Sequence, residues 1–182
     1  MAEIFFTAEP EANALLADNS FALLVGLVLY QQVPVEKAFA GPYVLAGRID
    51  GPLEAATVAA MDPTALEEVF RAKPAIHRFP ANMAKRTHGV ARHVVDRLDG
   101  EPEHLWDDGA DGATVLGRMK ELPGFGDYKA RVYLGVLAAH FGVRPLGIEG
   151  LVPDWPSIAD VTSAADLAEL KARKKAWKES QS

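Results

Sequence analysis

Leu122-Pro123-Gly124-Phe125-Gly126-Asp127-Tyr128-Lys129-Ala130 is the stretch that decides the fold, because it lies between two runs that look helical. Ala113 to Glu121 precedes it and Lys129 to Phe141 follows it, each with apolar residues at helical spacing. Proline and glycine together end the first helix, and glycine accepts the positive φ that a tight reversal needs. A connection this short makes the two helices antiparallel or sharply crossed. The stretch therefore predicts a helical hairpin over residues 113–141.

The same turn has the chemistry to hold an anion. Backbone N–H groups around Gly124 and Gly126 have no helix partner, and the first N–H groups of the following helix are also free. Such groups cradle phosphates in many proteins, because they are donors at the positive end of a helix. We therefore interpret the turn as a phosphate-binding element.

Composition limits the class of protein. The chain has 182 residues, 49% hydrophobic and 24% charged, which fits one large soluble domain or two small lobes. It has no cysteine, so disulfides, thiolate zinc sites and cysteine-ligated iron–sulfur clusters are excluded. The net charge of −6 argues against coating nucleic acid by bulk charge, although basic residues cluster in 71–92 and 171–178.

The ends and the apolar runs suggest a cytoplasmic protein. Residues 1–11 contain early acids and no basic stretch, so we expect no signal peptide. Phe21 to Tyr30, the longest apolar run, is too short to span a bilayer. We expect a monomer that is cytoplasmic and, in a prokaryote, associated with the nucleoid, with no membrane partner.

The remaining segments also have helical patterns, with no sustained alternation that would indicate strands. Asn19-Ser20 and Asp62-Pro63 are helix start signals. The expected helices are Phe5–Ala17 (or an extended lead-in), Phe21–Tyr30, Val35–Arg48 with an interruption at Gly41-Pro42, the run after Pro63, Asn82–Leu98 and, after a cap at Ser163, Asp166–Trp177. The prediction is an all-α protein of roughly eight to ten helices in one domain, 1–182.

A second motif stands about ninety residues before the hairpin. Leu29-Tyr30-Gln31-Gln32-Val33-Pro34-Val35-Glu36-Lys37-Ala38 is an apolar helix end followed by two glutamines. Together, this motif and Leu122-Pro123-Gly124-Phe125-Gly126 resemble the helix-hairpin-helix base-excision DNA glycosylases, near 3-methyladenine DNA glycosylase II and endonuclease III. The resemblance covers about residues 21–156. It implies a two-lobed helical fold with the helix-hairpin-helix at about 113–141, and double-stranded DNA with a damaged base as the partner.

The resemblance assigns residues to the DNA interface. Gln31 or Gln32 would fill the gap that an extruded base leaves, although both glutamines could simply cap the preceding helix. The helix from Asn82 could also lie near DNA, unless its charges are a solvated face. The DNA-binding set is Gln31, Gln32, Gly124, Phe125, Gly126, Lys129, Lys85 and Arg86.

Two acids are candidates for the chemistry. In the family an aspartate in the loop after the second hairpin helix stabilises the oxocarbenium ion and helps position or deprotonate water. Glu149 is the closer match by distance from the hairpin, and Asp154 is the closer match by its Pro-Asp context. Neither reproduces the family's position, so the two remain alternatives beside the interpretation that both are ordinary exposed acids.

The strand-nicking lysine of bifunctional relatives is out of register. It stands two residues after the second hairpin glycine, where this chain has Tyr128, and Lys129 follows one position later. One residue is about 100° around a helix, so Lys129 should point elsewhere. We therefore expect a monofunctional enzyme in which Lys129 contacts phosphate or is solvated.

A base pocket would need aromatic walls. Tyr30, His77, Tyr128 and Trp155 are the candidates, because an extruded base stacks on such rings, and the alternative is that they belong to the core. The histidines show no metal spacing, so we expect no catalytic metal, and no iron–sulfur cluster is possible without cysteine. The resemblance also implies a monovalent cation at the hairpin carbonyl groups.

Three functions remain open. The leading one is a base-excision repair glycosylase, a hydrolase that cleaves the N-glycosidic bond of a damaged base in duplex DNA. The second is a non-catalytic module with this fold that recognises DNA distortion, which the imperfect acid loop and the displaced lysine favour. The third is a helical protein unrelated to DNA.

Overall fold

The computed structural model describes residues 2–182, which form nine α-helices and two short 3₁₀ helices with no strand. The all-α prediction is confirmed. The helices are α1 (Pro10–Asp18), α2 (Ser20–Leu29), α3 (Val35–Ala46), α4 (Ala55–Ala59), α5 (Pro63–Arg71), α6 (Pro80–Leu98), η1 (Pro102–Leu105), α7 (Gly112–Glu121), α8 (Asp127–His140), η2 (Ile158–Asp160) and α9 (Ala164–Ser180).

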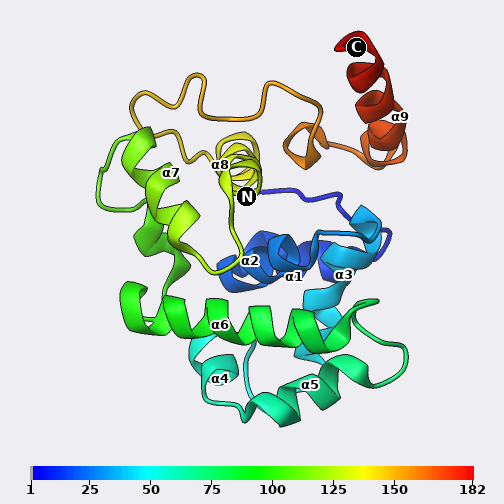
Figure 1. Ribbon diagram of the computed structural model, residues 1–182, viewed down its shortest axis with the longest axis vertical. Helices are drawn as coiled ribbons and strands as arrows, with labels where there is room; N and C mark the ends of the chain where they lie inside the picture. The colour runs from blue at the N-terminus through cyan, green and yellow to red at the C-terminus, as the bar shows by residue number, and fades with distance from the viewer. Residues whose placement is uncertain (1) are drawn as a thin grey trace.

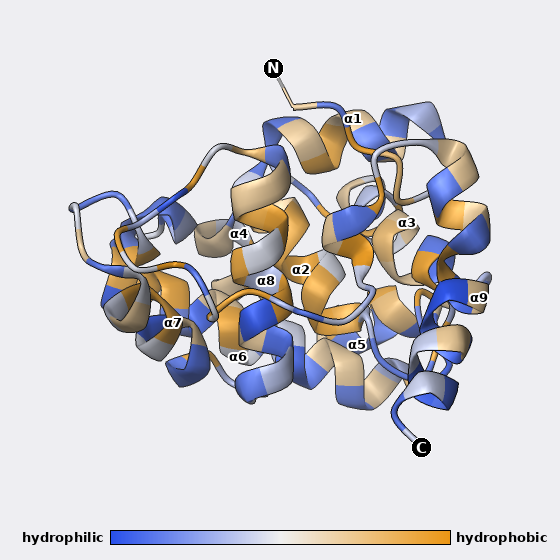
Figure 2. Ribbon diagram, turned by 90° about the horizontal axis from the view of Figure 1, so that it is seen from above, coloured by the Kyte–Doolittle hydropathy of each residue, from blue (hydrophilic) through white to orange (hydrophobic). Residues whose placement is uncertain are grey.

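Helix α2 is the centre of the molecule, with α6 on one side and α8 on the other (Figure 1). Its residues from Phe21 to Leu29 are all buried, as expected for a run that is apolar on every side. The Asn19 side chain caps it by accepting the N–H of Ala22 at 2.9 Å. Figure 2 shows the apolar α2 enclosed by helices with more polar outer faces.

The predicted break in α3 does not occur. The helix runs without interruption through Gly41-Pro42, although proline removes one hydrogen-bond donor. Packing explains this, because Gly41 lies against α2 so closely that a Cβ there would sit 2.4 Å from Leu29 Cδ1. Tertiary contact with α2 therefore outweighs the local cost of the proline. Helix α4 was not predicted at all.

Helices α4 and α5 pack against α6 and form the lower part of the molecule in Figure 1. Asp62 begins α5 as predicted, because its carboxylate accepts the N–H groups of Thr64 and Ala65. Helix α6 is 19 residues long and buries one face, including Met83, Val90 and Val94.

The upper part contains α7, α8 and the long loop that leads to α9 (Figure 1). Tyr133 of α8 is fully buried, with Phe125 and Trp106 beside its ring. Helix α9 buries only Leu170 and contacts mainly η2, so it lies at the edge of the molecule. Within residues 2–182 no single helix has the length and hydropathy of a membrane span, and only α1 and α2 together, bent by 116°, reach them.

Candidate nucleic-acid interface

The turn between α7 and α8 has the conformation its sequence predicts. The Phe125 N–H donates to Leu122 O at 3.0 Å, and Gly124 has a φ of +81°. With Pro123 before it, this is the pattern of a type II turn, which requires positive φ at its third residue. Gly124 and Gly126 are exposed, and their N–H groups have no acceptor in the described part of the chain. The turn therefore presents free donors to solvent.

Phe125 does not contribute in the way expected of a DNA contact. Its side chain is 5% exposed and its N–H is used in the turn. The ring packs 6.2 Å from Tyr133, measured between ring centroids. Phe125 therefore anchors the turn to the core and leaves Gly124 and Gly126 on the surface.

Helix α8 adds a second group of donors. Gly126 is its N-cap, so the N–H groups of Asp127, Tyr128 and Lys129 begin the helix without intrahelical acceptors. Asp127 is an acid at this end, but Lys120 pairs with it at 2.9 Å. The hydrogen bond from Lys120 lowers the pKa of Asp127. This pairing reduces the negative charge that an arriving anion would meet.

Three polar side chains lie together beside the turn. We call this group, Gln31, Arg86 and Lys129, the Gln31 cluster. Gln31 Nε2 donates to Val28 O at 3.2 Å, and Gln31 Oε1 accepts a long hydrogen bond from Arg86 Nη1 at 3.4 Å. Lys129 Nζ reaches the same Val28 oxygen at 3.3 Å. The structure thus joins residues from α6, α8 and the loop after α2.

Arg86 also touches the turn itself. A Cβ placed on Gly124 would lie 3.4 Å from Arg86 Nη1, and a Cβ on Gly89 would lie 3.8 Å from Pro123 Cβ. Arg86 and Gly89 are three residues apart, so one face of α6 lies along the turn. The guanidinium is therefore next to the free N–H groups.

Positive charge in the Gln31 cluster is not neutralised. Burial, and then the charge of Arg86, lower the pKa of Lys129 to about 8. Within residues 2–182 no carboxylate forms an ion pair with Lys129 or Arg86. Two cations without a counter-ion, beside free backbone donors, form an environment that favours a phosphate.

The two glutamines differ in what they can do. The Gln31 side chain is held by Val28, Arg86 and Met83 Sδ. Gln32 is exposed, and its φ of +58° is a left-handed conformation that is uncommon for a residue other than glycine. Among the described residues nothing bonds its side chain. Gln32 is therefore the glutamine whose side chain is exposed and not held by other residues.

The two candidate acids lie at different places on the loop after α8. The residue before Glu149 packs on the start of α7, where a Cβ on Gly112 would be 3.2 Å from Ile148 Cα. The ten residues of α7, about 15 Å of helix, separate that point from the turn. Asp154 instead precedes Trp155, whose ring stacks on Tyr128 in the first turn of α8. Both acids are exposed, and Asp154 is the one whose neighbour in sequence contacts the first turn of α8.

The four aromatic candidates do not form one pocket. Tyr128 and Trp155 stack on each other, with centroids 5.2 Å apart and an interplanar angle of 16°, and Arg131 lies 5.7 Å from the Trp155 ring. Tyr128 is still 57% exposed, so it can present ring surface to a partner. His77 is buried below Gln31.

Tyr30 is tied to the C-terminal helix. Its hydroxyl accepts a hydrogen bond from Lys174 Nζ at 2.6 Å, across 144 residues of chain. Burial, and then the charge of Glu36, raise the pKa of Tyr30 to about 12. Tyr30 lines a cavity of about 320 Å³ between the loop after α2 and α9. Lys174 is a residue that sequence reasoning missed as a partner of this loop, because no local pattern links the two.

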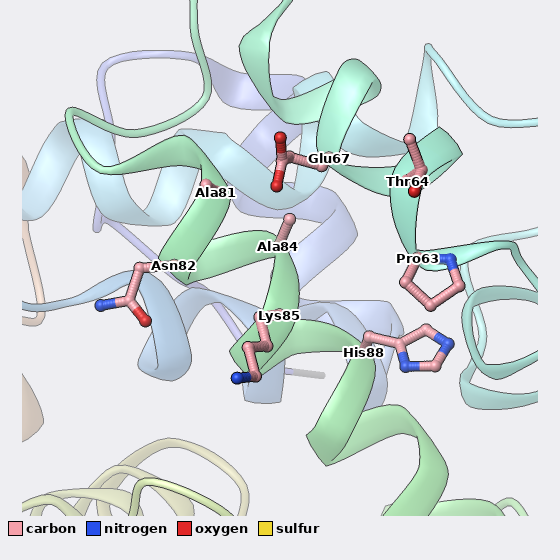
Figure 3. A pocket seen from close by; sticks show the side chains of 8 residues that line it. All are labelled: Pro63, Thr64, Glu67, Ala81, Asn82, Ala84, Lys85 and His88. Carbon is pink, nitrogen blue, oxygen red and sulfur yellow. The ribbon is translucent and has the colours of Figure 1, made fainter.

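Lys85 lies on a different face of α6 from Arg86. It lines a cavity of about 570 Å³ between α5 and α6, together with Glu67, Asn82 and His88 (Figure 3). His88 Nε2 is 3.2 Å from Met61 O, which fixes the ring in the wall of this cavity. The structure therefore brings Arg86 to the turn and leaves Lys85 outside the Gln31 cluster.

The structure identifies no metal centre in the region it describes, since no three His, Cys, Asp or Glu side chains in residues 2–182 gather as ligands. No family model, no curated protein and no solved structure matches the chain.

Proposed function

We propose that the protein is a monofunctional DNA glycosylase of the helix-hairpin-helix type, which releases a damaged base from duplex DNA. The observation that carries the proposal is that free backbone donors and two cations without a carboxylate partner lie beside the loop that carries an exposed glutamine. The donors belong to Gly124 and Gly126, the cations to Arg86 and Lys129, and the glutamine is Gln32.

The turn would grip one DNA strand. Backbone N–H groups bind phosphate oxygens without regard to base sequence, which suits an enzyme that must examine every site. Arg86 and Lys129 would add charge-assisted contacts to the same strand. In this proposal α7, the turn and α8 form the helix-hairpin-helix.

Gln32 would occupy the space left by the extruded base. Removing a base from the stack costs a few kcal/mol, and an inserted side chain offsets part of that cost. The left-handed backbone at Gln32 supports this role, because strained conformations of this kind occur often at functional sites. Tyr128, with its exposed ring, would stack on the extruded base.

Asp154 would carry the chemistry in preference to Glu149. Its carboxylate would take a proton from water as the water oxygen bonds to C1′ of the sugar. The bond from C1′ to the base nitrogen breaks, and its electron pair leaves with the base, which is then protonated. The products are a free base and an abasic site. Lys129 hydrogen-bonds Val28 O, so it is not directed at the sugar as a nucleophile.

The test is base release from duplex oligonucleotides that each carry one alkylated, deaminated or oxidised base. The proposal predicts a free base and an intact abasic strand for at least one class of lesion, with nicking only after alkali. Nicking without alkali would contradict the monofunctional assignment. Release from none of the lesions would contradict the glycosylase assignment.

A second candidate is a module that binds distorted DNA without cleaving it. The exposure of Asp154 favours it, because among the described residues no hydrogen bond orients its carboxylate for catalysis. This candidate predicts tighter binding to a duplex with a lesion or mismatch than to a matched duplex, with no base released. Equal affinity for both duplexes would argue against it.

A further inference from the structure

His77 is a buried histidine in the region between α5 and α6. It is 1% exposed, and its ring lies directly under the loop that carries the two glutamines. The Phe79 N–H donates to His77 Nδ1 at 3.0 Å. An Nδ1 atom that accepts a hydrogen bond carries no proton, so the proton of the neutral ring is on Nε2. Nε2 therefore donates to Gln31 O, which is 3.0 Å away.

The hydrogen bond from His77 holds Gln31, the residue before Gln32 with its positive φ. Gln31 O is the carbonyl of the peptide that links Gln31 to Gln32, and Gln32 has the left-handed backbone. Because His77 holds this carbonyl, rotation of the Gln31–Gln32 peptide is limited. The contact joins the loop after α2 to the segment that begins α6, because Phe79 is the N-cap of α6.

We propose that His77 is a positioning residue, which holds the Gln31–Gln32 peptide so that the Gln32 side chain points out of the protein and is ready to enter DNA. The inference rests on the proposed function for its catalytic consequence, although the hold on the loop exists without DNA. His77 would not touch the DNA, because it is buried. Its effect would be on base extrusion and on turnover, with little effect on the grip at Gly124.

Two substitutions of His77 distinguish the effect of its hydrogen bond to Gln31 from the effect of its side-chain volume. In His77→Gln the amide nitrogen reaches about as far as Nε2 and can still donate to the Gln31 carbonyl. In His77→Asn the shorter amide can still accept from the Phe79 N–H but does not reach Gln31. His88→Asn is a matched control, because it removes another bond between histidine Nε2 and a backbone carbonyl, that of Met61.

The first measurement is hydrogen exchange at the N–H groups of Tyr30 and Gln31, which donate to Leu27 O and Leu29 O, in the protein without DNA. We expect exchange to be about fivefold to tenfold faster in His77→Asn, as loss of one buried hydrogen bond implies, and near wild type in His77→Gln and His88→Asn. Unchanged exchange in His77→Asn would overturn the hold on the loop. This outcome would be independent of any activity on DNA.

The second measurement is on DNA, with 2-aminopurine beside the lesion to report base extrusion. His77→Asn should lower extrusion and kcat about fivefold to tenfold, with the affinity for duplex DNA within about twofold of wild type because phosphate contacts dominate it. His77→Gln should restore both. Equal loss in the two variants would overturn the positioning role. If the wild type releases no base while exchange behaves as expected, the glycosylase proposal fails and the hold on the loop stands.

Discussion

The turn after α7 and the loop after α8 are both rich in glycine and proline, but they differ in how firmly the structure holds their functional atoms. The turn is fixed by the Phe125 ring and by the hydrogen bond to Leu122 O, so its free donors have defined directions. The loop is fixed at Pro153, which packs on Gly135, and at Trp155, while Asp154 between them is exposed. The grip that we propose for DNA would therefore be preformed in the free protein, whereas the proposed acid would reach its working position only with substrate present.

The largest loss of activity should come from the acid that we propose as catalytic. Asp154→Asn keeps the shape of the side chain and removes its charge, so kcat for base release should fall about 10²- to 10³-fold. Glu149→Gln is the matched control, since it makes the same change beside the start of α7 and should leave kcat within about twofold. Single-turnover base release measures both. A large loss in Glu149→Gln alone would reverse the assignment.

A smaller effect, on stability and on DNA affinity, is expected from a substitution in the turn. Gly124→Ala places a Cβ on a residue with a φ of +81° and 3.4 Å from Arg86 Nη1. The left-handed conformation should cost about 1–2 kcal/mol of unfolding free energy. The affinity for duplex DNA should fall about tenfold with it, because the donor at residue 124 moves.

Gly126→Ala is the control for Gly124→Ala. Gly126 has no positive φ, and no atom lies within 4 Å of a Cβ built there. Its unfolding free energy should change by less than about 0.5 kcal/mol. Chemical denaturation and fluorescence anisotropy measure the two quantities. Equal losses of stability in the two variants would show that the turn conformation is not what the Gly124 variant disturbs.

The charge on Lys129 should make DNA binding depend on pH. Because burial lowers the pKa of Lys129 to about 8, the amine loses its charge as pH rises from 7 to 9. The affinity for DNA should therefore fall about threefold to tenfold over this range, as loss of one phosphate contact implies. Lys129→Arg keeps the charge and should remove most of the pH dependence.

The lowered pKa of Lys129 also affects stability, which should rise with pH whereas the affinity for DNA falls. The folded protein binds this proton less well than the unfolded chain, where lysine has its ordinary pKa of 10.5. The unfavourable contribution of Lys129 is therefore full below pH 8 and disappears as pH rises toward 10.5. A dependence of DNA affinity on pH that persists in Lys129→Arg would assign it to another group.

The smallest effect is expected away from both regions. Tyr30→Phe removes the acceptor of the Lys174 hydrogen bond and leaves the ring in place. The unfolding free energy should fall by about 0.5–1.5 kcal/mol, and the affinity for DNA should not change. Weaker DNA binding in Tyr30→Phe would extend the interface to the cavity beside α9.

Helices with local start signals could be predicted from the sequence. Asn19, Asp62 and Ser163 each accept a backbone N–H at the start of a helix, as their residue types suggest. Helix α4 was missed because Glu54 before it forms no side-chain cap and the helix has only five residues. The break predicted at Gly41-Pro42 was wrong because a close contact with Leu29, distant in sequence, decides that segment.

The candidate site was also predictable only where local sequence decides the conformation. The turn conformation follows from Pro123-Gly124, and the direction of Lys129 follows from one step around a helix. The choice between Glu149 and Asp154 could not be made by counting residues, because the path of the loop is set by packing on Gly112 and Gly135. The different states of Gln31 and Gln32 also depend on Arg86 and Met83, which are more than fifty residues away.

The most direct test of the central claim is a ¹H–¹⁵N spectrum of the protein titrated with a short undamaged duplex. We expect the amide signals of Gly124 and Gly126 to be among the most strongly shifted, together with those of the side chains of Arg86 and Gln32. The shifts should weaken as the salt concentration increases. Binding that shifts signals elsewhere and leaves Gly124 and Gly126 unchanged would contradict the central claim.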